Sequence, residues 1–329
     1  MRKNIFIMSI LLIILLLINS NSVEVYYSVI ATSFSDKETD ISYYENENLI
    51  KKEHYRIGGI EKTYNNGKVL ISKYSNELID LNIRPEKFYV YKNPVDYLYF
   101  ENGIYILHNE GVNSFSLKKY SEDYDIVLSS KIFKGYPMNF VAHHGLFYVL
   151  ANVYDDVSNR TVKLYVVDSN KLEYVKEIIV KNQTFGFYVE ENNNVLKIYG
   201  NKNEDTMFLA LSEYNVERNK MSNSIEFDEK ALWVDEVIRI KEIKFIVNTF
   251  SVIVLNEKNE IIRTLKLEDR AIIDCEYDSR EKIFIVLAGN YQKGEFEVLT
   301  YDKNLTMLSK FKLYSGSRRP TDIVIINEL

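Results

Sequence analysis

One pattern recurs along the chain, and its clearest copy is Leu164-Tyr-Val-Val-Asp168-Ser-Asn-Lys-Leu-Glu-Tyr-Val-Lys-Glu-Ile178. An apolar strand ends in Asp, a short polar turn follows, and a strand of alternating apolar and polar residues comes next. Alternation with a period of two is typical of a strand with one buried face. The pattern returns from Val252 to Leu265, with Asn in place of Asp, and from Val298 to Leu308. It predicts a fold assembled from similar small β-sheets.

The pattern belongs to a longer unit of four short strands, named A to D in chain order. Consecutive units of roughly 40 residues run over 59–91, 97–133, 138–180, 185–227, 231–267 and 272–313. The turn between strands A and B twice holds Asn-Gly, at Asn66-Gly67 and Asn102-Gly103, which supplies the positive φ of a tight hairpin. Repeated four-stranded units are typical of the blades of a β-propeller.

The two ends of the chain complete each other in this interpretation. Residues 25–31, 40–44 and 49–57 resemble strands B, C and D of a unit that lacks strand A, and Asp322 to Ile326 forms a lone apolar strand. If that strand supplies the missing A, the ring closes as about seven blades and removes exposed sheet edges. We therefore predict one closed propeller over residues 23–329. A pair of β-sandwiches or an open β-solenoid are the alternatives.

The N-terminus predicts export. Arg2 and Lys3 precede an uncharged apolar run from Ile5 to Ile18, and Ser20-Asn21-Ser22 offers small residues for cleavage. The apolar run is short for a membrane span. We expect residues 1–22 to be a cleaved signal peptide and the mature protein to be secreted or extracytoplasmic. An uncleaved membrane anchor is the alternative.

The composition excludes some classes of protein. The chain is 46% hydrophobic and 27% charged, which is ordinary for a globular protein. Its net charge of −6 argues against binding to a nucleic-acid backbone, which requires a basic surface. Cys275 is the single cysteine, so no intrachain disulfide can form, and its apolar neighbours predict a buried side chain.

The stretch Leu164-Tyr165-Val166-Val167-Asp168, followed by Val175 to Ile178, resembles the repeat of YVTN-type propellers. Nearly the whole mature chain resembles the wider superfamily that also includes quinoprotein-like and WD40-like propellers. Trp233 is the only Trp and precedes Val234, so the Trp-Asp ending is missing, as are the kelch Gly-Gly signature and a tryptophan-docking pattern for a quinone. That superfamily includes binding scaffolds, outer-membrane assembly factors, lactonases and quinone dehydrogenases. The resemblance therefore implies a fold and leaves the function open.

Motifs for cofactors and metals are missing from the sequence. It contains no Gly-rich phosphate loop, HExxH or GxSxG element, so we expect no cofactor. His143 and His144 are adjacent, and neighbours on a strand point to opposite faces, so we expect no metal site there. Asp155-Asp156 lacks the spacing of a calcium loop, which favours a solvated turn.

The loops suggest a binding face. In a propeller the B–C and D–A loops emerge together, and ligands commonly bind on such loops. The D–A loops carry basic residues, which are Lys92, Lys134, Lys181, Arg318 and Arg319. The B–C loops carry acids, among them Asp155 and Asp156. An acidic outer ring around a basic inner ring would focus an anionic ligand toward the channel. The alternative is that these loops are simply polar.

These observations favour an exported, monomeric, non-catalytic binding or assembly module whose partner is a protein or a small anionic ligand. The alternative is an exported hydrolase or lactonase, because acid–base catalysis needs two carboxyl groups facing one pocket. The acids on or beside inner strands are Asp96, Asp235, Asp274 and Asp322. Without catalysis, they would cap strand ends by hydrogen bonds. A membrane-anchored sensor is a third possibility if residues 1–22 are retained.

Overall fold

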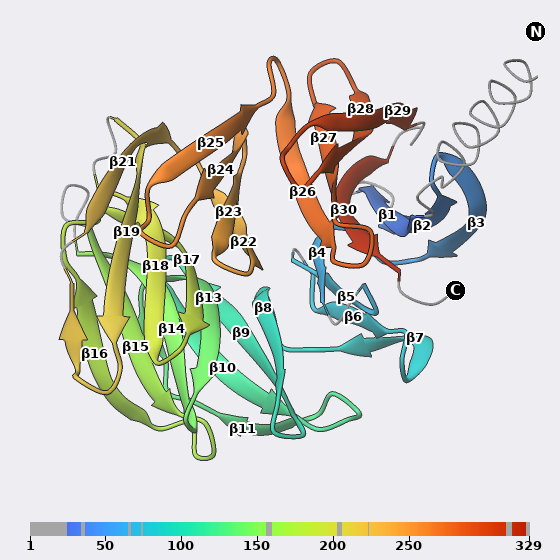
Figure 1. Ribbon diagram of the computed structural model, residues 1–329. Helices are drawn as coiled ribbons and strands as arrows, with labels where there is room; N and C mark the ends of the chain where they lie inside the picture. The colour runs from blue at the N-terminus through green and yellow to red at the C-terminus, as the bar shows by residue number, and fades with distance from the viewer. Residues whose placement is uncertain are drawn as a thin grey trace, which may run out of the picture.

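The computed structural model describes residues 25–33, 37–64, 67–73, 75–155, 160–202, 206–222, 224–313 and 318–326. These residues form seven small antiparallel sheets arranged in a ring and contain no helix (Figure 1). The predicted closed β-propeller is therefore confirmed. The expected signal segment, residues 1–22, lies outside the described residues. Within the described part of the chain, no helix is both long and apolar enough to cross a membrane.

We number the sheets as blades 1 to 7 in chain order. Blade 1 contains β1 (Tyr26–Ser33), β2 (Glu38–Glu45), β3 (Asn48–Tyr55) and β30 (Arg319–Ile325). Blade 2 contains β4 (Ile60–Tyr64), β5 (Val69–Ser72), β6 (Glu77–Asp80) and β7 (Arg84–Tyr89). Blade 3 contains β8 (Pro94–Phe100), β9 (Gly103–Gly111), β10 (Ser114–Tyr120), β11 (Ile126–Ser129) and β12 (Phe133–Lys134). Blade 4 contains β13 (Tyr136–His143), β14 (Leu146–Tyr154), β15 (Arg160–Asp168) and β16 (Tyr174–Val180).

The remaining blades follow the same order of strands. Blade 5 contains β17 (Phe185–Asn192), β18 (Val195–Asn201), β19 (Phe208–Asn215), β20 (Lys220–Met221) and β21 (Ile225–Lys230). Blade 6 contains β22 (Val234–Ile240), β23 (Ile243–Asn248), β24 (Ser251–Leu255) and β25 (Ile261–Lys266). Blade 7 contains β26 (Ala271–Asp278), β27 (Ile283–Asn290), β28 (Glu295–Asp302) and β29 (Met307–Leu313). Blades 3 and 5 differ from the predicted four strands because two short segments share their outermost position.

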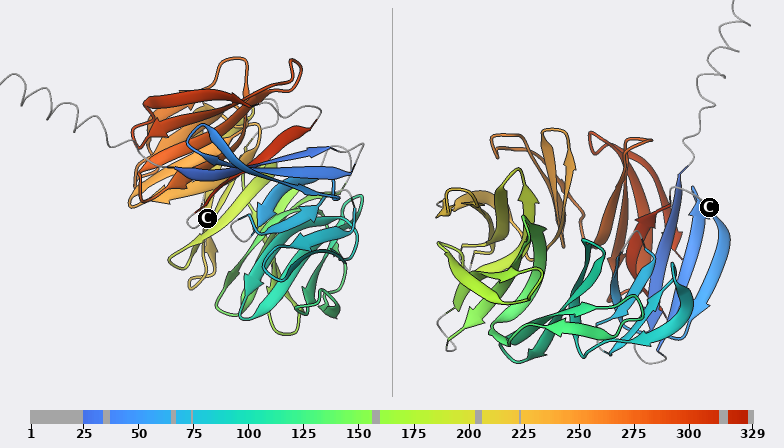
Figure 2. Two further views of the ribbon diagram at one scale, coloured as in Figure 1. Left: turned by 90° about the vertical axis from the view of Figure 1, so that its right-hand side faces the viewer. Right: turned by 90° about the horizontal axis from the view of Figure 1, so that it is seen from below.

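The C-terminal strand closes the ring. β30 pairs antiparallel with β1, and Ile323 lies opposite Val29. Figure 2 shows the red C-terminal strand beside the blue N-terminal strands. Ile323 is fully buried, so the closure buries apolar surface in addition to pairing the backbone. The predicted completion of the N-terminal blade by the last strand is confirmed.

Apolar cores lie between neighbouring blades. The core between blades 3 and 4 gathers several aromatic rings, and Phe115 meets Tyr165 edge to face at 5.3 Å between ring centroids. Cys275 is buried in the core between blades 6 and 7, as the sequence predicts. Further clusters follow around the ring, so each blade shares an apolar core with the next one. Alternating strand faces thus bury both sides of every blade.

Every inner strand contains a β-bulge near its start. The inner strands, which are the first strands of the units, are β30, β4, β8, β13, β17, β22 and β26. In each of them the pairing with the second strand shifts by one residue, as between Pro94 and Asp96 on β8. A bulge re-aims the following side chain, and bulges are frequent next to functional sites.

Candidate functional site: the central cavity

A cavity of about 360 Å³ lies where the inner strands begin. Its walls include residues from the inner strands of all seven blades. The B–C and D–A loops, which the sequence predicts to form the ligand face, lie at this same end of the strands. The volume is at the lower end of the range typical of small-molecule sites.

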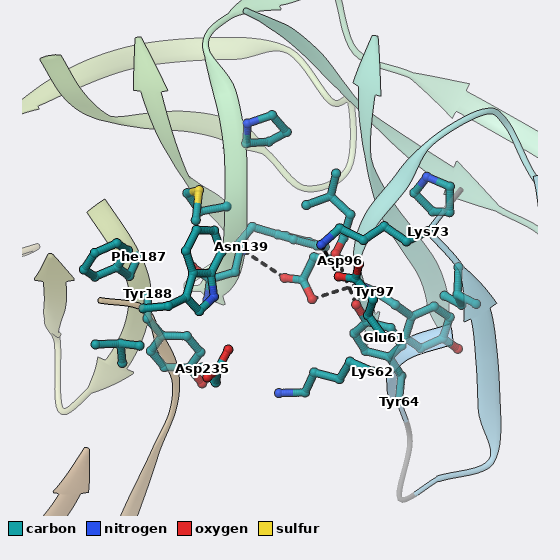
Figure 3. Close-up of a pocket in the computed structure, with 18 of the residues that line it drawn as sticks. Glu61, Lys62, Tyr64, Lys73, Asp96, Tyr97, Asn139, Phe187, Tyr188 and Asp235 are labelled. Carbon is teal, nitrogen blue, oxygen red and sulfur yellow. Dashed lines mark hydrogen bonds and ion pairs between the residues drawn. The ribbon is translucent and has the colours of Figure 1, made fainter. Parts of the chain in front are cut away.

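Each bulge is followed by a polar residue, and six of these seven residues, all but Glu236, line the cavity. We call the residues that follow the extra residue of each bulge the polar ring; they are Asp322, Lys62, Asp96, Asn139, Tyr188, Glu236 and Asp274. The extra residue itself lies one position earlier, and in blade 6 it is Asp235. Figure 3 shows Lys62 extending into the open centre of the cavity, with Asp96 and Asp235 on either side.

Part of the polar ring fastens neighbouring blades together. Four side chains of the polar ring accept a hydrogen bond from a backbone N–H of the next blade. In each case the donor is the residue directly after that blade's own ring residue. The pairs are Asp322 with Thr63 (2.6 Å), Asp274 with Ile323 (2.9 Å), Asp96 with Phe140 (3.1 Å) and Asn139 with Val189 (2.9 Å). Asp322 also accepts the Thr63 hydroxyl. Asp96, Asp274 and Asp322 therefore make the structural contact that the sequence offered as the alternative to catalysis.

Lys62 holds a positive charge at the centre of the ring. Protein surrounds it, yet its side chain projects into cavity space that water can reach. Burial by itself would lower the pKa of Lys62, but the nearby carboxylates of Glu236 and Asp274 outweigh burial and raise that pKa well above its usual value. The surrounding carboxylates thus favour the ammonium form of Lys62.

The acids of the cavity resist ionisation. Burial raises the pKa of Asp96 to about 6, although the N–H groups of Phe140 and Tyr97 oppose that rise. Burial, followed by repulsion from Asp274, raises the pKa of Asp235 to about 7. Burial raises the pKa of Asp322 as well, with Asp274 adding to the effect. The cavity therefore carries more carboxyl groups than its own cation can neutralise.

An aromatic wall closes one side of the cavity. Trp233 and Phe187 have ring centroids 5.6 Å apart, and both line the cavity beside Tyr188. Trp233 is 37% exposed, which leaves part of the indole open to solvent. Asp235 follows two residues later, next to this wall. No hydrogen bond or ion pair joins the Asp235 carboxylate to another described residue, so an unpartnered acid lies beside an aromatic surface.

The four acids named from the sequence, Asp96, Asp235, Asp274 and Asp322, all line this one cavity. Lys62, Glu236 and the aromatic wall were missed by the sequence analysis. Lys62 follows Glu61 on β4 of blade 2, and only the position of Lys62 after the β4 bulge gives it a place in the polar ring. An alignment of the seven A strands at their bulges would have found it.

The basic loop residues mostly make ion pairs with acids at the rim. Lys134 pairs with Asp155, and Lys92 lies 3.7 Å from Glu110. Arg318 pairs with both Glu38 and Asp40 in blade 1. The sequence analysis placed the basic residues in an inner ring and the acidic residues in an outer ring. These ion pairs bring members of the two groups into direct contact.

Two further basic residues have other surroundings. The Arg319 guanidinium lies 5.8 Å from the centroid of the Tyr291 ring, and the backbone oxygen of Lys181 accepts the Ser224 hydroxyl at 2.8 Å. Asp156 lies outside the described residues. A ligand-binding role for these loop residues stays a prediction.

Comparison with known proteins supports the fold. No family model and no curated protein matches the chain. A functionally unknown protein from Desulfotomaculum acetoxidans has a TM-score of 0.63 and 10% identity, covering 91% of this chain and 98% of its own. A candidate 6-phosphogluconolactonase from Bacteroides fragilis has a TM-score of 0.58 and 9% identity, covering 94% and 99%. Hydrazine synthase from Kuenenia stuttgartiensis has a TM-score of 0.58 and 10% identity, covering 80% and 88%. At these identities the likeness concerns the fold alone.

Proposed function

We propose that this protein is an exported, non-catalytic β-propeller that binds a small ligand in its central cavity. The observation that carries this proposal is the cavity itself, which all seven blades build and which holds Lys62 and Asp235 without ion-pair partners among the described residues. Charged side chains that face a cavity without an ion-pair partner are available to a ligand, which supports a binding role for this cavity.

The binding proposal can be tested by filling the cavity. Val95 is half-buried on the cavity wall, so Val95→Phe should occupy part of the free volume. A matched control is Val112→Phe, because Val112 is 100% exposed on a hairpin turn. Fragments detected by saturation-transfer NMR should lose their signal with Val95→Phe and keep it with Val112→Phe. Fragment signals that survive Val95→Phe would contradict a site in the cavity.

Export is the second part of the proposal, and it is supported by the charged and apolar pattern of residues 1–22. Mass spectrometry of the protein purified from its native host should find a mature chain that starts near Val23. A chain that begins at Met1 in the membrane fraction would instead support an anchored sensor.

A second candidate, an exported hydrolase or lactonase, is favoured by one observation. Asp96 and Asp235 line the same cavity with raised pKa values, as a pair of acid–base groups would. Hydrolysis of δ-lactones and aryl esters should be compared between the natural protein and Asp235→Asn. A hydrolysis rate above that in buffer alone, which falls at least about 100-fold in the variant, would support the hydrolase. Equal rates for the two proteins would contradict it.

A further inference from the structure

Building on the proposed binding function, we infer that the ligand of the central cavity is a small organic cation, an amine with an apolar body. This reverses the charge that the loop lysines suggested. Three separate features of the cavity support the inference: its balance of charges, the lysine that it already contains, and the position of its aromatic wall.

The carboxyl groups of the cavity outnumber its cations. The carboxyl groups that line it belong to Glu61, Asp96, Asp235, Asp274 and Asp322, and Glu236 acts on Lys62 from beside the cavity. Among the described residues, Lys62 is the cation that faces them from the polar ring, because Lys73 is engaged by Glu61. One ammonium cannot neutralise this group, and an added cation would favour ionisation of the remaining acids.

Lys62 shows which chemistry the ring accepts. Its ammonium group makes no ion pair within 4.0 Å of a described carboxylate, although acids of three blades act on it. The ring as a whole therefore stabilises an ammonium at its centre, without a dedicated partner. The ammonium group of a ligand would be the second ammonium in the cavity. It would be attracted by the same carboxylates but would lie closer to Asp235, to which no described side chain supplies a partner.

The aromatic wall suits the apolar body of such a ligand. The indole is the side chain that attracts cations most strongly through its face, and Trp233 is partly open beside Phe187. Asp235 lies two residues from Trp233 on the same chain segment. An amine placed between them would gain charge attraction on one side and ring contact on the other.

Three probes of one shape test the charge preference: benzylammonium, benzyl alcohol and benzoate. Calorimetry should show benzylammonium binding at least about tenfold more tightly than benzyl alcohol, with benzoate weakest. Asp235→Asn keeps the shape and should weaken benzylammonium several-fold. Glu122→Gln, at an exposed turn of blade 3, is the control and should change nothing. If calcium ions at equal concentration displace benzylammonium, the inference that the ligand is an organic cation is wrong.

The failure of this inference differs from the failure of the proposed function. If benzyl alcohol or benzoate binds best and Val95→Phe abolishes that binding, the cavity is a binding site but the cation preference is wrong. If none of the three probes binds, both proposals are overturned.

Truncation of Lys62 gives an independent test. Lys62→Ala vacates the ammonium position, so propylammonium at millimolar concentration should raise the thermal midpoint of this variant by several degrees. Propanol should not do so, and neither compound should affect Lys171→Ala, which removes an exposed lysine. If Lys62→Ala does not fold, refolding yield with and without propylammonium is the readout. Equal effects of propylammonium and propanol would contradict the inference.

Discussion

The rim and the centre of the propeller treat charge in opposite ways. At the rim Asp40 is nearly buried but meets Lys52, His54 and Arg318, and these partners lower its pKa although burial alone would raise it. At the centre Asp235 has no such partner, and its pKa rises to about 7. Burial raises the pKa of both acids, and the partners that Asp40 has and Asp235 lacks reverse the outcome at Asp40. Paired charges stabilise the fold, whereas unpaired ones lower its stability and remain available to a ligand.

The largest pH effect is expected at His108, because burial disfavours its protonated form. His108 contacts the Tyr120 hydroxyl at 2.9 Å and the Lys92 carbonyl at 3.0 Å, and burial lowers its pKa to about 4. The unfolded chain binds the proton more readily, so the free energy of unfolding should fall as pH drops from about 6.5 to 4, by about 3 kcal/mol at most.

Urea titrations of the natural protein and His108→Gln at pH 7 and pH 4.5 measure this contribution. The variant should lose less stability than the natural protein between the two values. A loss of equal size would show that burial of His108 does not set the acid limit.

The next effect concerns the paired rim. Asp40→Asn removes the charge that Lys52, His54 and Arg318 share, and should lower the free energy of unfolding by about 2 kcal/mol at pH 7. Since the folded pKa of Asp40 lies below the unfolded value, its stabilisation is present above about pH 4 and is lost as pH falls below it. Denaturant melts should therefore converge for the two proteins below pH 3. If the variant is as stable as the natural protein at pH 7, the paired charges at the rim do not stabilise the fold.

The unpaired centre should respond in the opposite direction. The folded pKa of Asp235 lies above the unfolded value, so its protonated form stabilises the fold below about pH 4, and this contribution is lost as pH rises through 7. Asp235→Asn should thus raise the free energy of unfolding at pH 8 by about 1 kcal/mol. The test is calorimetric melting at pH 4 and pH 8, with a clearly larger gain at pH 8. Destabilisation at pH 8 would mean that Asp235 is paired after all.

The smallest effect is expected from the exposed rim pair of Lys134 and Asp155, whose side chains are half-exposed. Solvent screens such a pair, so Lys134→Ala should change the free energy of unfolding by less than about 0.5 kcal/mol. The same urea titration measures it. A larger loss would extend the stabilising role of the rim to its outermost charges.

The sequence predicted the fold more fully than the site, for physical reasons. Strand alternation and turn residues are local, so the units and the closing strand at Asp322–Ile326 could be recognised directly. The polar ring depends on β-bulges. A bulge changes which of two neighbouring residues, such as Asp235 and Glu236, lies opposite a residue of the second strand. At the rim, Arg318 pairs with Asp40, a residue nearly the whole chain away. Composition and local pattern contain no information about such contacts.

The pairing of β30 with β1 also sets an order of assembly. β1 leaves the ribosome long before β30, its inner neighbour in blade 1. Until then β1 presents an open backbone edge, which invites pairing with other chains. The nascent protein must therefore wait for β30 before it can become a sealed circle, and a stop codon that truncates the chain before β30 would leave that edge permanently open.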